Sequence, residues 1–380
     1  MTIINEQKEL ENLCIKLARC DFMTIDTEFI REKTYWPVLC LIQIGWPDGQ
    51  ACIDPKAGLD MAPFVKLLEN PAVTKVLHSG GQDVEIFLHL YDIIPSPIFD
   101  TQIAAQMLGF GEAASYQSLV SSLCKVTLDK GQRFTDWSKR PLTDEQVQYA
   151  LSDVTYLRDV YAKLKQRLED AGRTDWAQEE TRHAFTRQHY AVDYQRICHK
   201  MMPTRASART AGALDALVKW RESKAMQLDR PRRHILTDEH IVALASVLPG
   251  DIQALEGVRV GVPSKMRQEV LDVIAAAPPA AKPAVRDDSA QSGRLRPIIQ
   301  LLTVLLHIKA HDGKVAAKVI ASSDDLHALA ADDNADIPAL GGWRRQIFGD
   351  DALALKRGEL AFAYDPDGRR IVVRKEQAKE

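Results

Sequence analysis

The stretch FMTIDTEFI, residues 22–30, decides the fold of this chain. Apolar and β-branched residues surround its two acids and predict a β-strand, in which side chains two positions apart point to the same face. Asp26 and Glu28 are therefore expected to project together. Carboxylate oxygens suit hard divalent cations such as Mg²⁺ or Mn²⁺, whereas zinc prefers Cys and His. The strand predicts half of a metal site, although an isolated Asp-x-Glu is more often a solvated edge or an ion-paired group.

Two further acids lie in settings that fit the same chemistry. Asp83 follows the apolar segment VTKVLH and the turn SGG, where a strand gives way to a helix, and such ends carry sites in α/β sheets. Asp153 stands four residues after Tyr149 in a segment with helical periodicity, so both project from one helix face. Alone, Asp83 is more often a helix N-terminal acid and Tyr149 a half-buried core aromatic. Together, in this order, the four acids favour two-metal hydrolysis of phosphodiesters.

The same segments resemble a known family. The order Asp-x-Glu, Asp, Tyr-x-x-x-Asp is similar to the tyrosine branch of the DEDD exonuclease superfamily, because Gln148 stands where the histidine branch carries its His. Longer stretches resemble the ribonucleases D, namely IDTEFIREKTYWPVLCLIQIG, LHSGGQDVEIF, FDTQIAAQMLG, VTLDKGQRFTDWSKRPL and YALSDVTYL. The resemblance covers about residues 3–170. It implies an α/β domain of the RNase H-like exonuclease fold, with a mixed sheet flanked by helices.

The resemblance also implies a division of labour among the acids. Asp26, Glu28 and Asp153 would hold the metal that activates water, Asp26 would bridge to a second metal, and Asp83 would complete that second site directly or through water. Two cations about 3.5–4 Å apart can stabilise both the entering and the leaving oxygen, so no protein base is required. Tyr149, whose ordinary pKa is near 10, is assigned to orienting the water.

Substrate contacts are implied by the resemblance at three further positions. Thr27, Phe29 and His78 would lie near the terminal nucleotide, with attack from the 3′ end releasing nucleoside 5′-monophosphates. Phe29 can stack on a base from the strand end or belong to the core, and His78 alone is more often a structural histidine. Three cations precede the helix of Tyr149 and are either phosphate contacts or charges of a solvated loop: Lys130, Arg133 and Arg140.

Composition limits the remaining possibilities. The 380 residues, 46% hydrophobic and 27% charged, suffice for two or three domains with their own cores. The net charge of −3 does not indicate a nucleic-acid binder, but residues 182–233 hold 12 Lys/Arg against four acids. That stretch predicts phosphate binding through counterion release, with a solvated helix face as the alternative.

Cysteine usage and the N-terminus indicate the compartment. The six cysteines include no C-x-x-C and predict reduced thiols in a cytosolic protein. The start MTIINEQKEL has no cationic segment followed by an apolar core, and no run approaches 18 apolar residues. We expect a cytoplasmic location and no membrane association, and nothing indicates an obligate protein partner.

Past about residue 170 the pattern becomes helical throughout. We expect a polar connector over 171–209 and a small bundle over 210–275 that resembles the helicase-and-ribonuclease-D C-terminal (HRDC) domain, with Trp220 in its core. A Pro/Ala-rich linker, exposed and mobile, is expected over 276–293. A second, divergent HRDC-like bundle is expected over 294–380, with a short hairpin or tail from Asp365 on. Its VIASSDDLHALA echoes ILTDEHIVALA in the first bundle.

These observations predict a metal-dependent 3′-to-5′ exoribonuclease that uses two Mg²⁺ or Mn²⁺ ions. By resemblance the favoured substrates are tRNA precursors. Two alternatives remain open: a DNA-directed 3′-5′ exonuclease of the same superfamily, and a non-catalytic RNA-binding scaffold. All four carboxylates and the tyrosine are present, which argues against the scaffold because the loss of any one ligand would typically be enough to abolish such catalysis.

Overall fold

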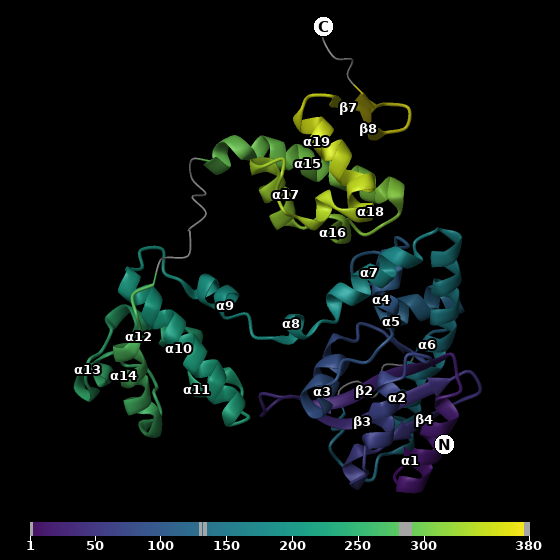
Figure 1. Ribbon diagram of the computed structural model, residues 1–380, viewed down its shortest axis with the longest axis horizontal. Coiled ribbons are helices and arrows are strands. Elements are labelled where there is room, and N and C mark those ends of the chain that lie inside the picture. The colour runs from purple at the N-terminus through teal and green to yellow at the C-terminus, as the bar shows by residue number, and fades with distance from the viewer. Residues whose placement is uncertain (1–2, 129–130, 132–134, 281–290, 376–380) are drawn as a thin grey trace.

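The computed structural model describes residues 3–128, 131, 135–280 and 291–375. Figure 1 shows an α/β domain, a first helical unit beside it and a second helical unit above it. None of the helices in these ranges is long and apolar enough to cross a bilayer.

The α/β domain contains a mixed six-stranded sheet. Its strand order is β1-β4-β3-β2-β5-β6. Strand β3 runs antiparallel to β2 and β4, whereas β1, β5 and β6 pair in parallel with their neighbours. The strands span Ile3–Ile4 (β1), Phe22–Ile30 (β2), Val38–Trp46 (β3), Gly49–Ile53 (β4), Thr74–Leu77 (β5) and Ile98–Asp100 (β6). The predicted mixed sheet is confirmed.

Helices cover both faces of this sheet, as expected. Met23 and Ile25 of β2 pack in one cluster with apolar residues of α1 (Gln7–Leu17), α2 (Ala62–Glu69) and α3 (Gly81–Tyr91). The other face is covered by the long helix α6 (Asp144–Asp170), whose Thr143 cap and Gln146 form a capping box. The remaining elements of the domain are α4 (Thr101–Gln106), α5 (Tyr116–Leu119), a 3₁₀ turn (Pro55–Ala57) and a π-helical turn (Val120–Cys124).

The first helical unit follows three connecting helices. These are α7 (Thr174–Ala184), α8 (Arg187–Tyr190) and α9 (Tyr194–Met201). The unit itself contains α10 (Ala208–Gln227), α11 (Arg232–Ile235), α12 (Asp238–Val247), α13 (Ile252–Gly257), a 3₁₀ turn (Ser264–Met266) and α14 (Arg267–Ala276). Trp220 packs against the core of this unit, and its Nε1 donates to Glu269 at 3.2 Å. The tryptophan is thus a partly buried residue packed on the core of the unit.

The second helical unit begins earlier than expected. Helix α15 (Gln291–Gly313) starts inside the predicted linker 276–293, of which residues 281–290 lie outside the described ranges. It is followed by α16 (Ala317–Ile320), α17 (Ser323–Ala331), a 3₁₀ turn (Pro338–Leu340), α18 (Gly342–Arg344), a π-helical turn (Arg345–Gly349) and α19 (Asp350–Lys356). The hairpin of β7 (Leu360–Asp365) and β8 (Arg370–Lys375) closes the unit, so its first strand precedes the expected start at Asp365.

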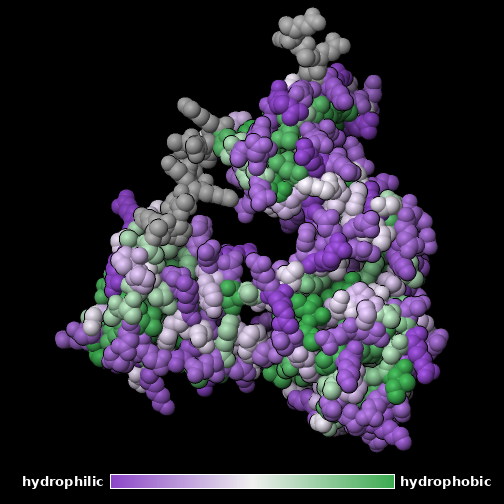
Figure 2. All heavy atoms as spheres, viewed as in Figure 1, coloured by the Kyte–Doolittle hydropathy of each residue, from purple (hydrophilic) through white to green (hydrophobic). Residues whose placement is uncertain are grey.

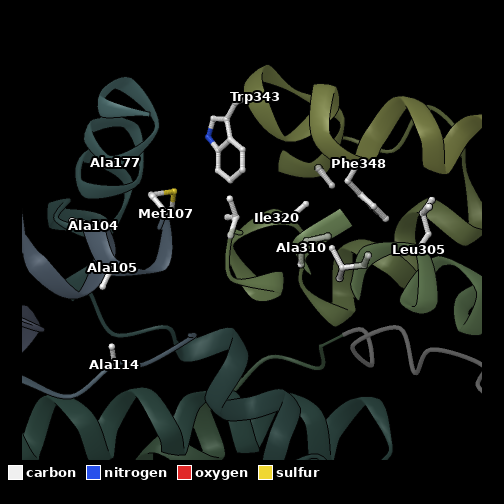
Figure 3. Packing of buried hydrophobic residues seen from close by; sticks show 14 of the residues in the cluster. Ala104, Ala105, Met107, Ala114, Ala177, Leu305, Ala310, Ile320, Trp343 and Phe348 are labelled. Carbon is white, nitrogen blue, oxygen red and sulfur yellow. The ribbon is translucent and has the colours of Figure 1, made fainter. Parts of the chain in front are cut away.

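The second helical unit shares a hydrophobic core with the α/β domain. One cluster joins Met107 and Leu164 of the α/β domain to Ile320 and Trp343 of the unit (Figure 3). The indole rings of Trp176 and Trp343 stack with centroids 4.6 Å apart. The second unit is therefore packed on the α/β domain as part of one folded body, although the first unit separates the two along the chain.

Candidate active site

Strand β2 presents its acids to helix α6. Asp26 pairs with Gln43 across the β2–β3 ladder, and Glu28 pairs with Leu41. The even-numbered residues of β2 therefore face away from the α1–α3 cluster that holds Met23 and Ile25. The ladder register shifts between Glu28 and Phe29, so the regular alternation ends directly after the second acid.

A close approach of helix α6 to the sheet brings Asp153 to these acids. The hydroxyl of Thr24 donates to the carbonyl of Val154 at 2.9 Å. A Cβ built on Gly45 would lie 2.4 Å from Thr24 Oγ1 and 3.0 Å from Val154 O. Only glycine fits at this contact, which holds the turn of α6 that carries Asp153 against the strand that carries Asp26.

Three carboxylates converge as a result. Ligand oxygens of Asp26, Glu28 and Asp153 all lie within 4.8 Å of one another. Burial raises the pKa of Glu28 to about 8, with the charges of Asp153 and Asp83 adding to it, and burial raises the pKa of Asp153 to about 7. The pKa of Asp26 is also raised, first by burial and then by the neighbouring acids. No described Lys or Arg forms an ion pair with this cluster.

The fourth acid joins from helix α3. Asp83 lies in the first turn of α3 and accepts a hydrogen bond from Thr27 Oγ1 at 2.5 Å. Burial raises its pKa to about 6, although the hydrogen bonds from Thr27 and the backbone act in the opposite direction. Its negative charge is also among the causes that raise the pKa of Asp26. Asp83 thus lies beside the cluster of Asp26, Glu28 and Asp153, on the side of helix α3.

The turn that positions Asp83 is fixed by Asp100, for which the sequence predicts no role at the site. The carboxylate of Asp100 accepts hydrogen bonds from the backbone N–H groups of Ser79, at 3.3 Å, and Gly80, at 2.9 Å. It also caps α4 by accepting from Gln102 N at 2.8 Å. An Asp directly before a helical segment indicates a cap. The contact of Asp100 with the turn at Ser79 and Gly80 cannot be predicted from the sequence around Asp100, because that turn is about 20 residues away.

Tyr149 lies on the same helix as Asp153 and is half-buried. Its ring packs against the cluster of Cys40 and Leu41, and its centroid lies 6.2 Å from that of Trp137. The ring is thereby supported from the side of the sheet. The spacing of four residues in one helix directs Tyr149 and Asp153 to one face.

The three predicted substrate contacts have different surroundings. The Thr27 hydroxyl is engaged with Asp83. Phe29 is partly buried against the α1–α3 cluster, so its ring belongs at least in part to the core. His78 Nδ1 lies 2.9 Å from Thr101 Oγ1, and burial lowers the pKa of this half-buried imidazole. Their contacts to the terminal nucleotide stay predictions.

The three predicted loop cations are only partly described. Arg140 forms an ion pair with Asp54 at 2.6 Å and donates to the carbonyl of Cys40 at 2.7 Å. Its guanidinium thereby ties the loop before α6 to the sheet, which favours a structural role over a phosphate contact. Lys130 and Arg133 lie outside the described residues.

Gln43 is a second residue for which the sequence predicts no role at the site. It pairs with Asp26 across the ladder and is fully buried. Neither its Oε1 nor its Nε2 has a hydrogen-bond partner among the described residues. A glutamine inside an apolar strand is the only signal that the sequence gives for this position.

The oxygen donors fit a hard divalent cation. Four partly or fully buried carboxylates without a described cationic partner are stable together only when protonated or when positive charge is supplied. The α/β domain is of the 3′-5′ exonuclease class, as its family match shows. Residues 1–169 match the family model described as 3′-5′ exonuclease, and residues 211–277 match the HRDC domain.

Relatives extend this likeness over nearly the whole chain. Ribonuclease D of Granulibacter bethesdensis is 43% identical over 96% of this chain and 94% of its own length. Ribonuclease D of Acidiphilium cryptum is 42% identical over 98% and 96%. The crystal structure of Escherichia coli RNase D, described as an exoribonuclease involved in structured RNA processing, matches with a TM-score of 0.80 and 28% identity over 94% of this chain and 98% of that one. The chain belongs to the ribonuclease D family and is a 3′-5′ exoribonuclease.

Proposed function

We propose that this exoribonuclease removes nucleotides from RNA 3′ ends with two divalent cations, Mg²⁺ or Mn²⁺, and releases nucleoside 5′-monophosphates. The observation that carries the proposal is the convergence of Asp26, Glu28 and Asp153, whose ligand oxygens lie within 4.8 Å of one another. Asp83 and Thr27 flank this cluster. Burial and the neighbouring acids raise the pKa values of Asp26 and Glu28, which supports a site that binds cations.

The side chains divide the work by position. Asp26, Glu28 and Asp153 would hold one cation, and Asp26 with Asp83 would hold the other. When bound, the pair lowers the pKa of water and stabilises the charge on the entering and leaving oxygens. Thr27 fixes the carboxylate of Asp83 through its hydrogen bond. Tyr149 orients the attacking water, because a phenol with a pKa near 10 is a poor base at neutral pH.

For the substrate we propose structured RNA, with the 3′ ends of tRNA precursors as the favoured case. The proposal follows the relative from E. coli, whose described role is structured RNA processing. The basic stretch 182–233 supports contacts to a phosphate backbone outside the acidic site. All six cysteines are free thiols. Because free thiols persist in reducing compartments, we place the enzyme in the cytoplasm.

A ladder assay tests the proposal directly. RNA labelled at its 5′ end is incubated with the enzyme and Mg²⁺ or Mn²⁺, the shortened RNA is resolved by length, and the released nucleotides are identified by chromatography. We expect stepwise shortening from the 3′ end and release of nucleoside 5′-monophosphates, both abolished by EDTA. Asp26→Ala is the control. A wild-type enzyme that cuts no faster than this variant would contradict the proposal.

The DNA-directed alternative is separated by substrate alone. Single-stranded RNA and DNA of the same sequence are digested in parallel, because the carboxylate chemistry is the same for both. We expect a higher kcat/KM for RNA. A preference for DNA would move the proposed substrate to DNA while leaving the metal mechanism intact.

A further inference from the structure

We infer that a cavity between the α/β domain and the first helical unit binds backbone phosphates of the RNA strand, upstream of the nucleotide being removed. The inference rests on the proposed function, since it names where the rest of the same substrate lies. The cavity has a volume of about 640 Å³. Its walls come from the loop after β2 and from helices α9, α10 and α11.

Positive charge dominates these walls. Glu32 and Asp238 are the acidic residues in the lining. The cationic or titratable lining residues are Arg31, Lys200, Arg221, Arg232, Arg233 and His234. A cleft lined by charges of one sign attracts a ligand of opposite charge. The attraction is stronger than that of the same charges on a convex surface. The negatively charged ligand that a ribonuclease binds is the phosphate backbone of an RNA strand.

The cations fall into two groups. Three arginines are ion-paired with carboxylates and so belong to the wall: Arg221 with Glu222 and Asp238, Arg232 with Glu222, and Arg31 with Glu85. Lys200 and Arg233 are exposed and have no ion-pair partner among the described residues. Both side chains are available to phosphate oxygens, and Arg233 also interacts electrostatically with Glu239.

The cavity is adjacent to the candidate active site. Arg31 follows β2, three positions after Glu28. Its guanidinium forms two hydrogen bonds with Glu85, at 2.8 and 2.9 Å, and Glu85 lies two positions beyond Asp83 on α3. Arg31 therefore lies in the cavity lining and is also bonded to α3, the helix that carries Asp83. An RNA strand whose 3′ end lies at the four carboxylates would extend from the active site into the positively charged cavity.

The geometry of the cavity is fixed from both sides. The side chain of Asp229, which follows α10, accepts hydrogen bonds from the backbone N–H groups of Tyr35, at 3.0 Å, and Trp36, at 3.1 Å. The Trp36 ring stacks on His89 of α3 with centroids 4.1 Å apart. Figure 1 shows the loop after β2 reaching toward α11, and Figure 2 shows an opening between the first helical unit and the rest of the molecule. The loop after β2 thus fixes the position of the first helical unit relative to the active site.

Binding is tested in a background that cannot cut. In the Asp26→Ala protein, a fluorescein-labelled single-stranded RNA of about 12 nucleotides is titrated by anisotropy at several salt concentrations. We expect Lys200→Gln with Arg233→Gln to weaken binding by about tenfold and to lower the slope of log K against log salt by about 1.4, because each phosphate contact on a single strand contributes about 0.7.

A matched variant separates a local contact from a change in net charge. Arg259 is exposed, lies in the same helical unit and is outside the cavity lining. Arg259→Gln should leave the salt slope unchanged. An equal fall of the slope in this variant, or no fall in the double variant, would overturn the inference. Thermal melts of all variants exclude a loss of folding as the cause.

A second readout uses substrate length in the enzyme with an intact site. A dinucleotide has one phosphodiester group, which the carboxylates engage, and so has none left for the cavity. We expect the ratio of kcat/KM for the long RNA to that for the dinucleotide to fall about tenfold in the double variant. An unchanged ratio contradicts the cavity assignment while cleavage by the wild type still supports the proposed function. A wild type without cleavage contradicts the proposed function itself.

Discussion

In the metal-free protein, Glu28 and Asp153 should retain protons at pH values where ordinary carboxylic acids have lost them. Their pKa values of about 8 and about 7 lie well above the value near 4 of the unfolded chain. Between these limits the folded protein holds protons that the unfolded chain has released. The free energy of unfolding of the metal-free protein should therefore fall as the pH rises from about 4 to about 8.

Thermal melts in EDTA across this pH range measure that fall. Adding Mn²⁺ or Mg²⁺ should raise the Tm more at pH 8 than at pH 5, because the ions replace protons on the same oxygens. A metal-free Tm that rises steadily up to pH 8 would mean that these acids are better solvated than the structure indicates.

Substituting Gln43 should raise the free energy of unfolding, whereas most core substitutions lower it. Both polar atoms of its buried amide lack a described partner, and such a group costs about 1–3 kcal/mol. Gln43→Met keeps the volume and removes the amide, so we expect the free energy of unfolding to rise by about 1 kcal/mol. Urea titration measures it.

Gln146 supplies the matched control. It is equally a buried glutamine, but its Oε1 accepts from Thr143 N and its Nε2 donates to Thr135, both at 2.9 Å. Gln146→Met should lower the free energy of unfolding by about 1–2 kcal/mol. Equal losses in both variants would show that the amide of Gln43 is satisfied in solution.

The contact between β2, β3 and α6 sets the geometry of the site. A Cβ at Gly45 would overlap Thr24 Oγ1 at 2.4 Å and meet Val154 O at 3.0 Å. Gly45→Ala should push α6 outward, costing about 1–3 kcal/mol of stability and lowering kcat by about a hundredfold. Steady-state kinetics and denaturant titration measure both effects. Gly250→Ala, where nothing lies within 4 Å, should change neither.

The sequence predicts the elements of the site better than their contacts. The strand of Asp26, the helix start at Asp83 and the helix of Asp153 follow from local periodicity and turn residues, and the structure has all three. The ladder shift after Glu28 and the two-sided role of Asp100 do not follow, because each depends on a partner remote in sequence. The pairing of Arg140 with Asp54 has the same origin.

Arg344 joins the second helical unit to helix α7. Its guanidinium is buried and forms ion pairs with Glu179 and Glu180. Glu179, Glu180 and His183 have ligand atoms close enough to hold a metal, but the arginine supplies the charge there. This second acidic cluster is therefore an ion-paired contact between units.

Removing this arginine should uncouple the two bodies. Arg344→Ala leaves two carboxylates unpaired and should lower the free energy of unfolding by about 3–5 kcal/mol. Calorimetry should show one shared transition for the α/β domain and the second unit in the wild type, and two in the variant. Arg345→Ala removes an exposed arginine next to it and should leave the shared transition in place.

The core shared by the α/β domain and the second helical unit has a consequence for synthesis on the ribosome. Residues of α15 to α19 cover the apolar face that contains Met107, Leu123 and Leu164. These helices emerge only after the entire first helical unit has been translated. At about 5–20 residues per second, the nascent exonuclease half exposes an uncovered apolar face for on the order of ten seconds. Chaperone binding to ribosome-attached chains should be strongest in that interval and end when the last helices dock.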